Sequence, residues 1–294
     1  LVEHVLEALR PLRAHPTVVV CGHGGAAVRR ALEGRDVLFA DQMEQKGTGH
    51  AVQCALPAVG GFRGDLLVLC GDTPLLTAEI LAELVAAHRA AARALTVLSA
   101  DLDRPGGLGR IVRGADGSLR AIREARDAPP EVLAIREINT GVLVADADLL
   151  PGALARVKPD NAQREYYLTD VPGILLRDGR AVAVHKSPDP GAALGVNDPC
   201  ELAEATRALR RRILDRLLAA GVRIEDPGTT VVDAGVEVGE GTLLKPFTLL
   251  ERDVRIGARC TVGPFAHLRE GAVVREGAAV GAFARVPARE EPHG

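Results

Sequence analysis

Two loops of this chain contain residues that could hold a metal ion and a phosphorylated ligand. The stretch 70–74 places Asp72 directly after a continuous apolar run, where a carboxylate is well placed for a divalent cation that bridges phosphates. In the loop 41–51, Gly47 and Gly49 allow backbone N–H groups to approach a ligand closely, and Thr48 offers a hydroxyl. Each pattern is also typical of an ordinary turn or helix cap, so both interpretations stay open at this point.

Further polar residues lie among apolar neighbours: Glu124, Glu137, Asn139 and Asn197. Each one alone is typical of a cap or a turn. Together they would supply the many hydrogen bonds that a polyhydroxylated ligand requires. The glycine cluster 22–25 lacks both the G-x-G-x-x-G spacing and the lysine of a P-loop, and it predicts only a tight turn.

These loops need a scaffold, and the first two thirds of the chain alternate between strand and helix patterns. We predict strands at 17–21, 37–40, 65–70 and 94–100, with helices at 1–12, 26–32, 49–56 and 77–92. Shorter strands at 111–112, 119–122, 138–144 and 181–185 indicate a mixed layer. The pattern favours an α/β domain with a mostly parallel sheet, in which ligands bind at the carboxyl ends of the strands.

A helix predicted over 198–220, with Pro199 in its first turn and Gly221 after its end, leads into a ladder of aliphatic residues. They recur every six positions: Val232, Val238, Leu244, Leu250, Ile256, Val262, Leu268, Val274, Val280 and Val286. Neither a helix nor a flat strand has this period, whereas a hexapeptide repeat that turns a corner after each short strand does. The ladder therefore predicts a short left-handed parallel β-helix, with a valine-rich β-meander as the alternative. Such prisms are typical of homotrimers.

Length and composition narrow the class of protein. The 294 residues suffice for two domains, which we place at 1–197 and 222–286, joined by a helix at 198–221 and followed by a polar tail at 287–294. A net charge of −3 with interspersed signs argues against binding to nucleic acid or insertion into a membrane. Five scattered cysteines predict reduced thiols in a cytoplasmic protein, without disulfides or a zinc site.

Several motifs together carry a family resemblance. The stretch 42–51 is similar to the Q-x-x-Q-L-G-T-x-H-A loop of sugar-1-phosphate nucleotidyltransferases. It is followed by Gly-Asp-Thr-Pro at 71–74, Gly-Leu-Gly-Arg at 107–110, Glu-Ile-Asn-Thr-Gly at 137–141, Asn-x-Gln-x-Glu-Tyr-Tyr-x-Thr-Asp at 161–170 and Gly-Val-Asn at 195–197. Their order and spacing resemble the bifunctional N-acetylglucosamine-1-phosphate uridyltransferase/glucosamine-1-phosphate acetyltransferase family over nearly the whole chain.

The resemblance implies a Rossmann-like nucleotidyltransferase domain that makes UDP-N-acetylglucosamine and pyrophosphate from UTP and N-acetylglucosamine-1-phosphate with Mg²⁺. It also implies a role for each matching residue. Gln42, Gly47 and Thr48 would contact the uracil, and Gly71 and Asp72 would lie along the ribose and phosphates. Gly109, Glu124 and Asn139 would hold the sugar, Asp72 and Asn197 would bind Mg²⁺, and Arg269 would bind a sugar phosphate on the β-helix.

Two departures from the family pattern shape the expectations. The family's first strand and glycine-rich loop, which hold the triphosphate, have no counterpart here, and we interpret the sequence as a fragment. The later coils with the catalytic histidine and much of the acetyl-CoA site also have no counterpart, and His267 does not align with that base, so we expect no acetyltransferase activity. Two alternatives stay open: a nucleotidyltransferase for another base or sugar, and a non-catalytic trimeric subunit that binds a sugar nucleotide.

Overall fold

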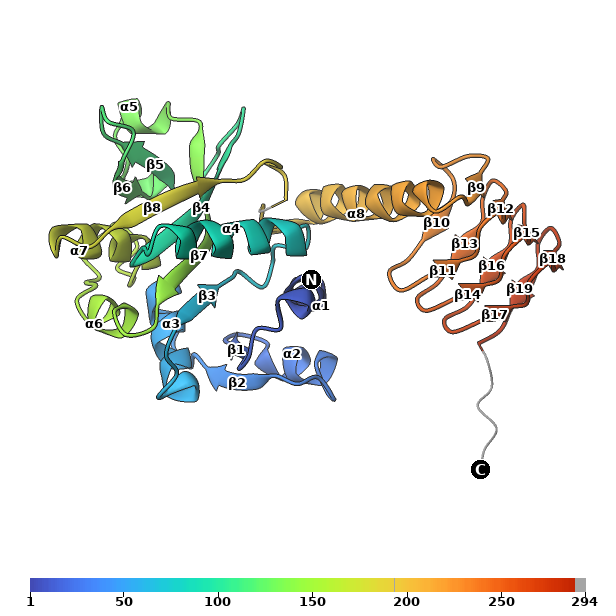
Figure 1. Ribbon diagram of the computed structural model, residues 1–294, viewed down its shortest axis with the longest axis horizontal. Coiled ribbons are helices and arrows are strands. Elements are labelled where there is room, and N and C mark those ends of the chain that lie inside the picture. Colours follow the sequence, from blue (N-terminus) through green and yellow to red (C-terminus); the bar gives the residue numbers. More distant parts are fainter. Residues whose placement is uncertain (193, 289–294) are drawn as a thin grey trace. The chain divides into compact units, whose positions relative to one another are not determined.

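The computed structural model describes residues 1–192 and 194–288, which divide into two compact units between Asn197 and Asp198 (Figure 1). In the described part of the chain, no helix combines the length and apolarity that a membrane crossing requires.

The first unit alternates between helix and strand, as the sequence predicts. Its longer helices are α1 (Val2–Leu9), α2 (Gly25–Ala31), α3 (Thr48–Ala55), α4 (Ala78–Ala90), α6 (Leu150–Leu154) and α7 (Val171–Arg177), and α5 (Pro130–Leu133) is a single turn. Its strands are β1 (Val18–Cys21), β2 (Leu38–Asp41), β3 (Asp65–Val68), β4 (Leu95–Asp101), β5 (Arg110–Arg113), β6 (Leu119–Arg123), β7 (Glu137–Asp146) and β8 (Val182–Lys186). Helices α5, α6 and α7 were not predicted, because four to seven residues with proline in the first turn show no helical period.

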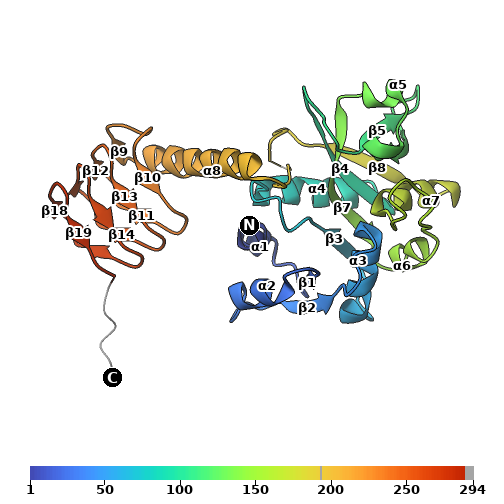
Figure 2. The ribbon, with the colours of Figure 1, turned by 180° about the vertical axis from the view of Figure 1, so that it is seen from behind.

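The main sheet is mixed. Its order is β6-β5-β7-β4-β8, and β3 also pairs with β7. Strands β4 and β8 are parallel, whereas β7 runs antiparallel to β3, β4 and β5. The apolar composition of β3 had favoured a parallel neighbouring strand. Its neighbour in the structure, β7, is antiparallel to it. Strands β1 and β2 form a separate parallel pair next to α3 (Figure 2).

Both faces of the main sheet are buried, and successive residues of β7 show it. Val142 and Val144 belong to the core under α4, while Leu143 and Ala145 belong to the core under α6 and α7. Successive side chains of a strand point to opposite faces, so a strand covered on both sides reads as a continuous apolar run. This double layer fixes the sheet whose strand ends carry the predicted site.

A buried histidine lies at the edge of the core under α4. His88 has 2% of its surface exposed, its Nδ1 lies 3.0 Å from the hydroxyl of Thr96, and its Nε2 lies 3.4 Å from a carboxylate oxygen of Asp65. Burial lowers the pKa of His88, and this effect outweighs the attraction of Asp65 and Asp146.

We expect this histidine to make the stability of the fold pH-dependent. The neutral imidazole is favoured in the folded state, so the unfolded chain binds more protons between the lowered pKa and about 6.5. The free energy of unfolding should therefore fall as the pH drops below about 6.5. Urea denaturation followed by circular dichroism at pH 7.5 and at lower pH measures it, since the chain has no tryptophan. In a His88→Gln variant, the free energy of unfolding should decrease less steeply with falling pH than in a His15→Gln variant, where the replaced histidine is exposed. An equal slope in both variants would show that His88 does not cause the pH dependence.

The second unit consists of α8 (Pro199–Ala219), capped by the side chain of Asp198, and a β-helix of two-residue strands. These strands are β9 (Arg223–Ile224), β10 (Val231–Val232), β11 (Glu237–Val238), β12 (Leu243–Leu244), β13 (Leu249–Leu250), β14 (Arg255–Ile256), β15 (Thr261–Val262), β16 (His267–Leu268), β17 (Val273–Val274), β18 (Ala279–Val280) and β19 (Arg285–Val286). Every aliphatic residue of the predicted ladder is the second residue of one of these strands.

Parallel pairing stacks the coils of the β-helix. Val231 pairs with Leu249 and Leu249 with His267, so each coil contains three hexapeptides. The ladder residues Leu244, Leu250, Val262 and Leu268 are fully buried, and the small or β-branched residues two positions earlier lie beside them. The predicted β-helix is confirmed. Strand β9 was not predicted. It pairs with β12, but it precedes the first ladder residue and does not follow the six-residue spacing.

Candidate active site

The loop 41–51, which leads into α3, is held against a segment that lies far away in the sequence. The N–H of Gly49 donates to the carbonyl of Tyr166 at 2.7 Å, and the N–H of Tyr166 donates to the carbonyl of Lys46 at 2.8 Å. A Cβ atom at Gly47 would lie 2.8 Å from the oxygen of Tyr166, and one at Gly49 would lie equally close to it. The two glycines thus serve close backbone packing against the segment 165–168.

Gln42 and Thr48 stabilise this loop internally. Gln42 donates from Nε2 to the carbonyl of Gly47 at 3.0 Å and lies 3.1 Å from Nδ1 of His50. The hydroxyl of Thr48 accepts the N–H of Leu168 at 3.1 Å. Both side chains therefore have structural partners, and both also line the large cavity described below.

Asp72 lies in the loop that follows β3 and meets the segment that ends at Asn197. Its carbonyl accepts the N–H of Val196 at 2.9 Å, and a Cβ atom at Gly195 would lie 3.3 Å from its carboxylate. The cap of α4 is supplied by Thr77, whose hydroxyl accepts the N–H of Ile80. The backbone thus brings together the neighbourhoods of the two residues predicted to bind Mg²⁺, although they are far apart in the sequence.

A bulge between β4 and β7 shapes the region around Asn139. The pairing shifts between Val97 and Ser99, and Gly141 takes a φ of +79° in mid-strand. The side-chain oxygen of Asn139 accepts the N–H of Gly141 at 3.3 Å, and the backbone N–H of Asn139 donates to the carbonyl of Gly109 at 2.8 Å. Gly141 is required here because a Cβ atom would lie 2.7 Å from the Sγ of Cys70.

Glu124 completes a cluster with Gly109 and Asn139. A Cβ atom at Gly109 would lie 3.3 Å from Oε2 of Glu124, so the backbone of Gly109 packs closely against this carboxyl group. The hydroxyl of Thr169 donates to Oε1 of Glu124 at 2.8 Å. Burial is the main cause of a raised pKa of Glu124, and the nearby carboxylates of Asp127 and Asp170 add to it. The three residues predicted to hold a sugar therefore form one contiguous group.

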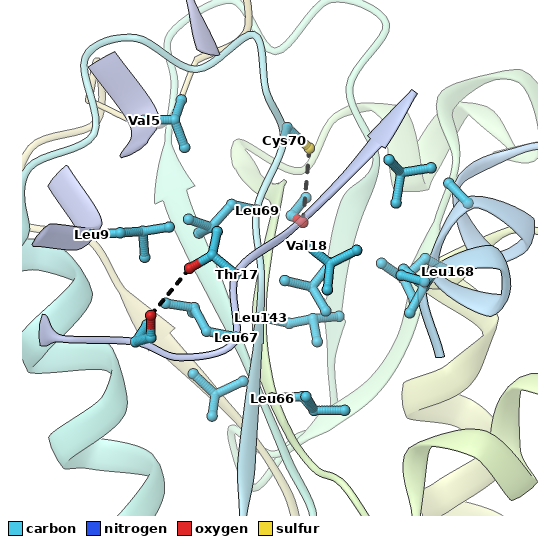
Figure 3. A pocket seen from close by; sticks show the side chains of 18 of the residues that line it. Val5, Leu9, Thr17, Val18, Leu66, Leu67, Leu69, Cys70, Leu143 and Leu168 are labelled. Atoms are coloured by element: carbon cyan, nitrogen blue, oxygen red, sulfur yellow. Dashed lines mark hydrogen bonds between the residues drawn. The ribbon is translucent and has the colours of Figure 1, made fainter. Parts of the chain in front are cut away.

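A cavity of about 1150 Å³ borders several of these parts, but Asp72 and Asn197 are not among the residues that line it. Among the predicted site residues, those that line it are Gln42, Thr48, Gly71, Glu124 and Asn139. Its other end is apolar, and Figure 3 shows Val18, Leu66, Leu67, Leu69 and Leu168 gathered around it. Burial raises the pKa of the Cys70 thiol in its wall to about 11, so this cysteine stays protonated and unreactive at neutral pH.

The apolar end of the cavity lies between two strand edges. Strand β1 pairs with β2, and β3 pairs with β7, without a second partner in the sheets of the described residues. Because Thr17 and Cys21 use their carbonyl groups to pair with the β2 side, the backbone groups of Val18 and Val20 point the other way. Residues of both β1 and β3 line this end of the cavity.

The remaining predicted residue belongs to the second unit. Arg269 follows β16, and its N–H donates to the carbonyl of Val286 at 2.9 Å. Nearby, the Nε2 of His267 lies 2.6 Å from a carboxylate oxygen of Glu251, and the pKa of that carboxyl is lowered chiefly by the N–H of Glu270 and by His267. The role of Arg269 in binding a phosphate stays a prediction.

The contact of Thr169 with Glu124, which supports the site, was not predicted from the sequence. Thr169 belongs to the quoted motif at 161–170, but nothing in the sequence indicates that it contacts Glu124. No cluster of three or more His, Cys, Asp or Glu side chains suited to a metal ion occurs in the part of the chain that the structure describes. A metal at Asp72 and Asn197 would thus take further oxygen ligands from a substrate or from water, as Mg²⁺ commonly does.

Comparison with known proteins identifies the family of this chain. The family model of the MobA-like NTP transferase domain matches residues 1–223. The "Bifunctional protein GlmU" of Corynebacterium efficiens is 46% identical over 270 residues, which cover 90% of this chain and 56% of that protein. The protein of the same name from Trichlorobacter lovleyi is 40% identical, covering 95% and 68%. The protein of that name from Exiguobacterium sp. is 43% identical, covering 93% and 60%.

The chain thus spans just over half the length of the Corynebacterium relative. The family match nevertheless covers the whole first unit and extends through α8 to β9. The mixed sheet and these identities lead to one conclusion: the chain belongs to the MobA-like NTP transferase domain family and, within it, to the family of the bifunctional GlmU proteins.

Proposed function

We propose that this chain transfers UMP from UTP to N-acetylglucosamine-1-phosphate, giving UDP-N-acetylglucosamine and pyrophosphate. Nucleotidyl transfer is the activity of its family. The observation that carries the more specific proposal is that the loop with Gln42 and Thr48, the strand end at Gly71, and the pair Glu124 and Asn139 line one cavity. The part of that cavity lined by Gln42 and Thr48 would hold the nucleotide, and the part lined by Glu124 and Asn139 would hold the sugar.

The reaction needs no protein nucleophile. A phosphate oxygen of the sugar phosphate attacks the α-phosphorus of UTP, the bond to the bridging oxygen breaks, and pyrophosphate leaves. Gln42, Gly47 and Thr48 would orient the uracil, and Gly71 would lie along the ribose and phosphates. Gly109, Glu124 and Asn139 would hold the sugar, where the Glu124 carboxyl still has acceptor capacity beyond its bond from Thr169. Holding both substrates in line supplies much of the rate enhancement.

The donor atoms at Asp72 and Asn197 fit Mg²⁺, which prefers carboxylate, amide and water oxygens and usually shares substrate phosphates. When bound there, Mg²⁺ would neutralise the charge that develops on the phosphates. The chain's own contribution is to keep the two segments together, through the bond from Val196 to the carbonyl of Asp72.

Pyrophosphate release tests the proposal. The chain would be mixed with UTP, N-acetylglucosamine-1-phosphate and Mg²⁺, beside a version extended by the family's N-terminal strand and glycine-rich loop. We expect release that requires both substrates and the metal, and that is greatest in the extended version, because the family resemblance assigns the binding of the triphosphate to that glycine-rich loop. Reactions without sugar phosphate or with EDTA are the controls.

Other substrates separate the remaining alternatives. Equal or faster release with CTP or dTTP, or with glucose-1-phosphate, would replace the proposed specificity by another base or sugar. Sugar-nucleotide binding without turnover in both versions would favour the non-catalytic binding subunit. We also propose that the chain forms a homotrimer through the β-helix and is located in the cytoplasm. We do not propose acetyltransferase activity for it.

A further inference from the structure

Arg110 is a buried arginine whose hydrogen bonds go to backbone carbonyl groups. It begins β5, and 3% of its surface is exposed. Its guanidinium donates to the carbonyls of Gly106 at 3.0 Å and of Leu108, both in the loop that precedes it, and to the carbonyl of Leu133 at 3.4 Å. A buried charge is tolerated only when hydrogen bonds compensate its lost hydration, and here those bonds fix the path of the loop 106–109.

That loop ends at the centre of the polar cluster. The carbonyl of Gly109 accepts the N–H of Asn139 at 2.8 Å, and its Cα lies so close to Glu124 that an added Cβ would come within 3.3 Å of the carboxylate. A displacement of the loop by a few tenths of an ångström would therefore change the spacing of all three residues. The guanidinium joins the loop to Leu133 at the end of α5, which gives the loop an anchor outside the cluster.

We propose that Arg110 is a positioning residue for the sugar phosphate: by holding the loop 106–109, it sets the distance between Gly109, Glu124 and Asn139. The inference rests on the proposed function, because it assigns this cluster to the sugar. Arg110 itself does not touch the substrate. The loop 41–51, which would contact the uracil, is fixed separately by its hydrogen bonds to the segment 165–168. A change at Arg110 should therefore leave nucleotide binding unaffected.

Steady-state kinetics of two variants test the inference. In Arg110→Met the apolar stem remains but three carbonyl groups lose their donor, and in Arg110→Lys a single ammonium cannot span the three acceptors. We expect the KM for N-acetylglucosamine-1-phosphate to rise about tenfold in both variants, which corresponds to the loss of about one net hydrogen bond. The KM for UTP should change less than about twofold. Arg120→Met, at a largely exposed arginine of the neighbouring strand β6, is the matched control and should change neither value.

A purely structural role would give a different result. An equal rise in both KM values, or no change in the KM for the sugar phosphate, would overturn the inference. If Arg110→Met does not fold, judged by its melting temperature, Arg110→Lys carries the comparison. Calorimetric titration with N-acetylglucosamine-1-phosphate separates the two proposals. If the parent and the Arg110 variants bind this sugar phosphate equally tightly, the inference alone is overturned. If the parent does not bind the sugar phosphate, the proposed function is overturned as well.

Discussion

The Asp72→Asn variant is expected to lose at least about 100-fold in the rate of pyrophosphate release, because metal stabilisation of the phosphates supplies several kcal/mol. An amide has nearly the same shape as a carboxylate, and the backbone carbonyl of Asp72 that accepts the N–H of Val196 is unchanged. The fold around Asn197 should therefore persist. The substitution removes only the negative charge that a magnesium ion would require.

Asp101→Asn is the matched control for this change. Asp101 also ends a strand of the main sheet, β4, but its side chain is half exposed and pairs with Lys186 at 2.8 Å. We expect its turnover to stay within about twofold of the parent, since exposed ion pairs contribute little. Raising the Mg²⁺ concentration should recover part of the activity of Asp72→Asn. Full activity of Asp72→Asn at ordinary Mg²⁺ concentrations would show that the metal assignment is wrong.

The Gly47→Ala variant is expected to lose both stability and nucleotide binding. Gly47 has a φ of +100°, and an added Cβ would lie 2.8 Å from the carbonyl oxygen of Tyr166 and 2.9 Å from the Cβ of Glu165. The backbone conformation alone costs about 1–2 kcal/mol for a residue with a side chain. The contact adds more, because Tyr166 can yield only by breaking its bonds to Gly49 and Lys46. We expect a total loss of about 3 kcal/mol in the free energy of unfolding and a higher KM for UTP.

Two other glycines separate the causes of this loss. Gly34 has a φ of +78° with no atom within 4 Å of an added Cβ, so Gly34→Ala should show only the backbone cost. Gly49 lies in α3 with an added Cβ 2.8 Å from the same carbonyl of Tyr166, so Gly49→Ala should show only the contact. Urea denaturation and UTP kinetics of the three variants measure both effects. A Gly47→Ala variant that resembles Gly34→Ala would mean that the loop moves away from Tyr166 at little cost.

From Val231 to Val286, the β-helix was predictable from the sequence residue by residue. Its coils repeat, so each position within the repeat keeps the same environment, and the buried ladder residues such as Leu250 and Val262 recur at a fixed step. The helix α8 was equally clear, since Asp198 and Pro199 begin it in the expected way. In such segments, local sequence and local structure carry the same information.

The site residues came from motifs, and the sequence could name them without showing how they meet. Glycine at position 109 directly precedes β5 and glutamate at position 124 directly follows β6, and their close approach depends on the pairing of β5 with β6 and β7. The contact of Thr169 with Glu124 spans 45 positions and follows no sequence period. Such contacts arise from packing between distant segments, on which a single local pattern carries no information.

The sequence by itself therefore determined the alternation of helix and strand, the β-helix with its buried ladder, and the identity of the candidate site residues. Only the tertiary structure decided that β7 runs antiparallel to three neighbours, that a bulge at Ser99 and Asn139 shapes the polar cluster, and that Gly47 and Gly49 pack against Tyr166. The physical reason is the range of the forces involved. Periodicity and capping act between residues near in sequence, whereas strand direction, register and close backbone contact are set by the simultaneous packing of both faces of the sheet.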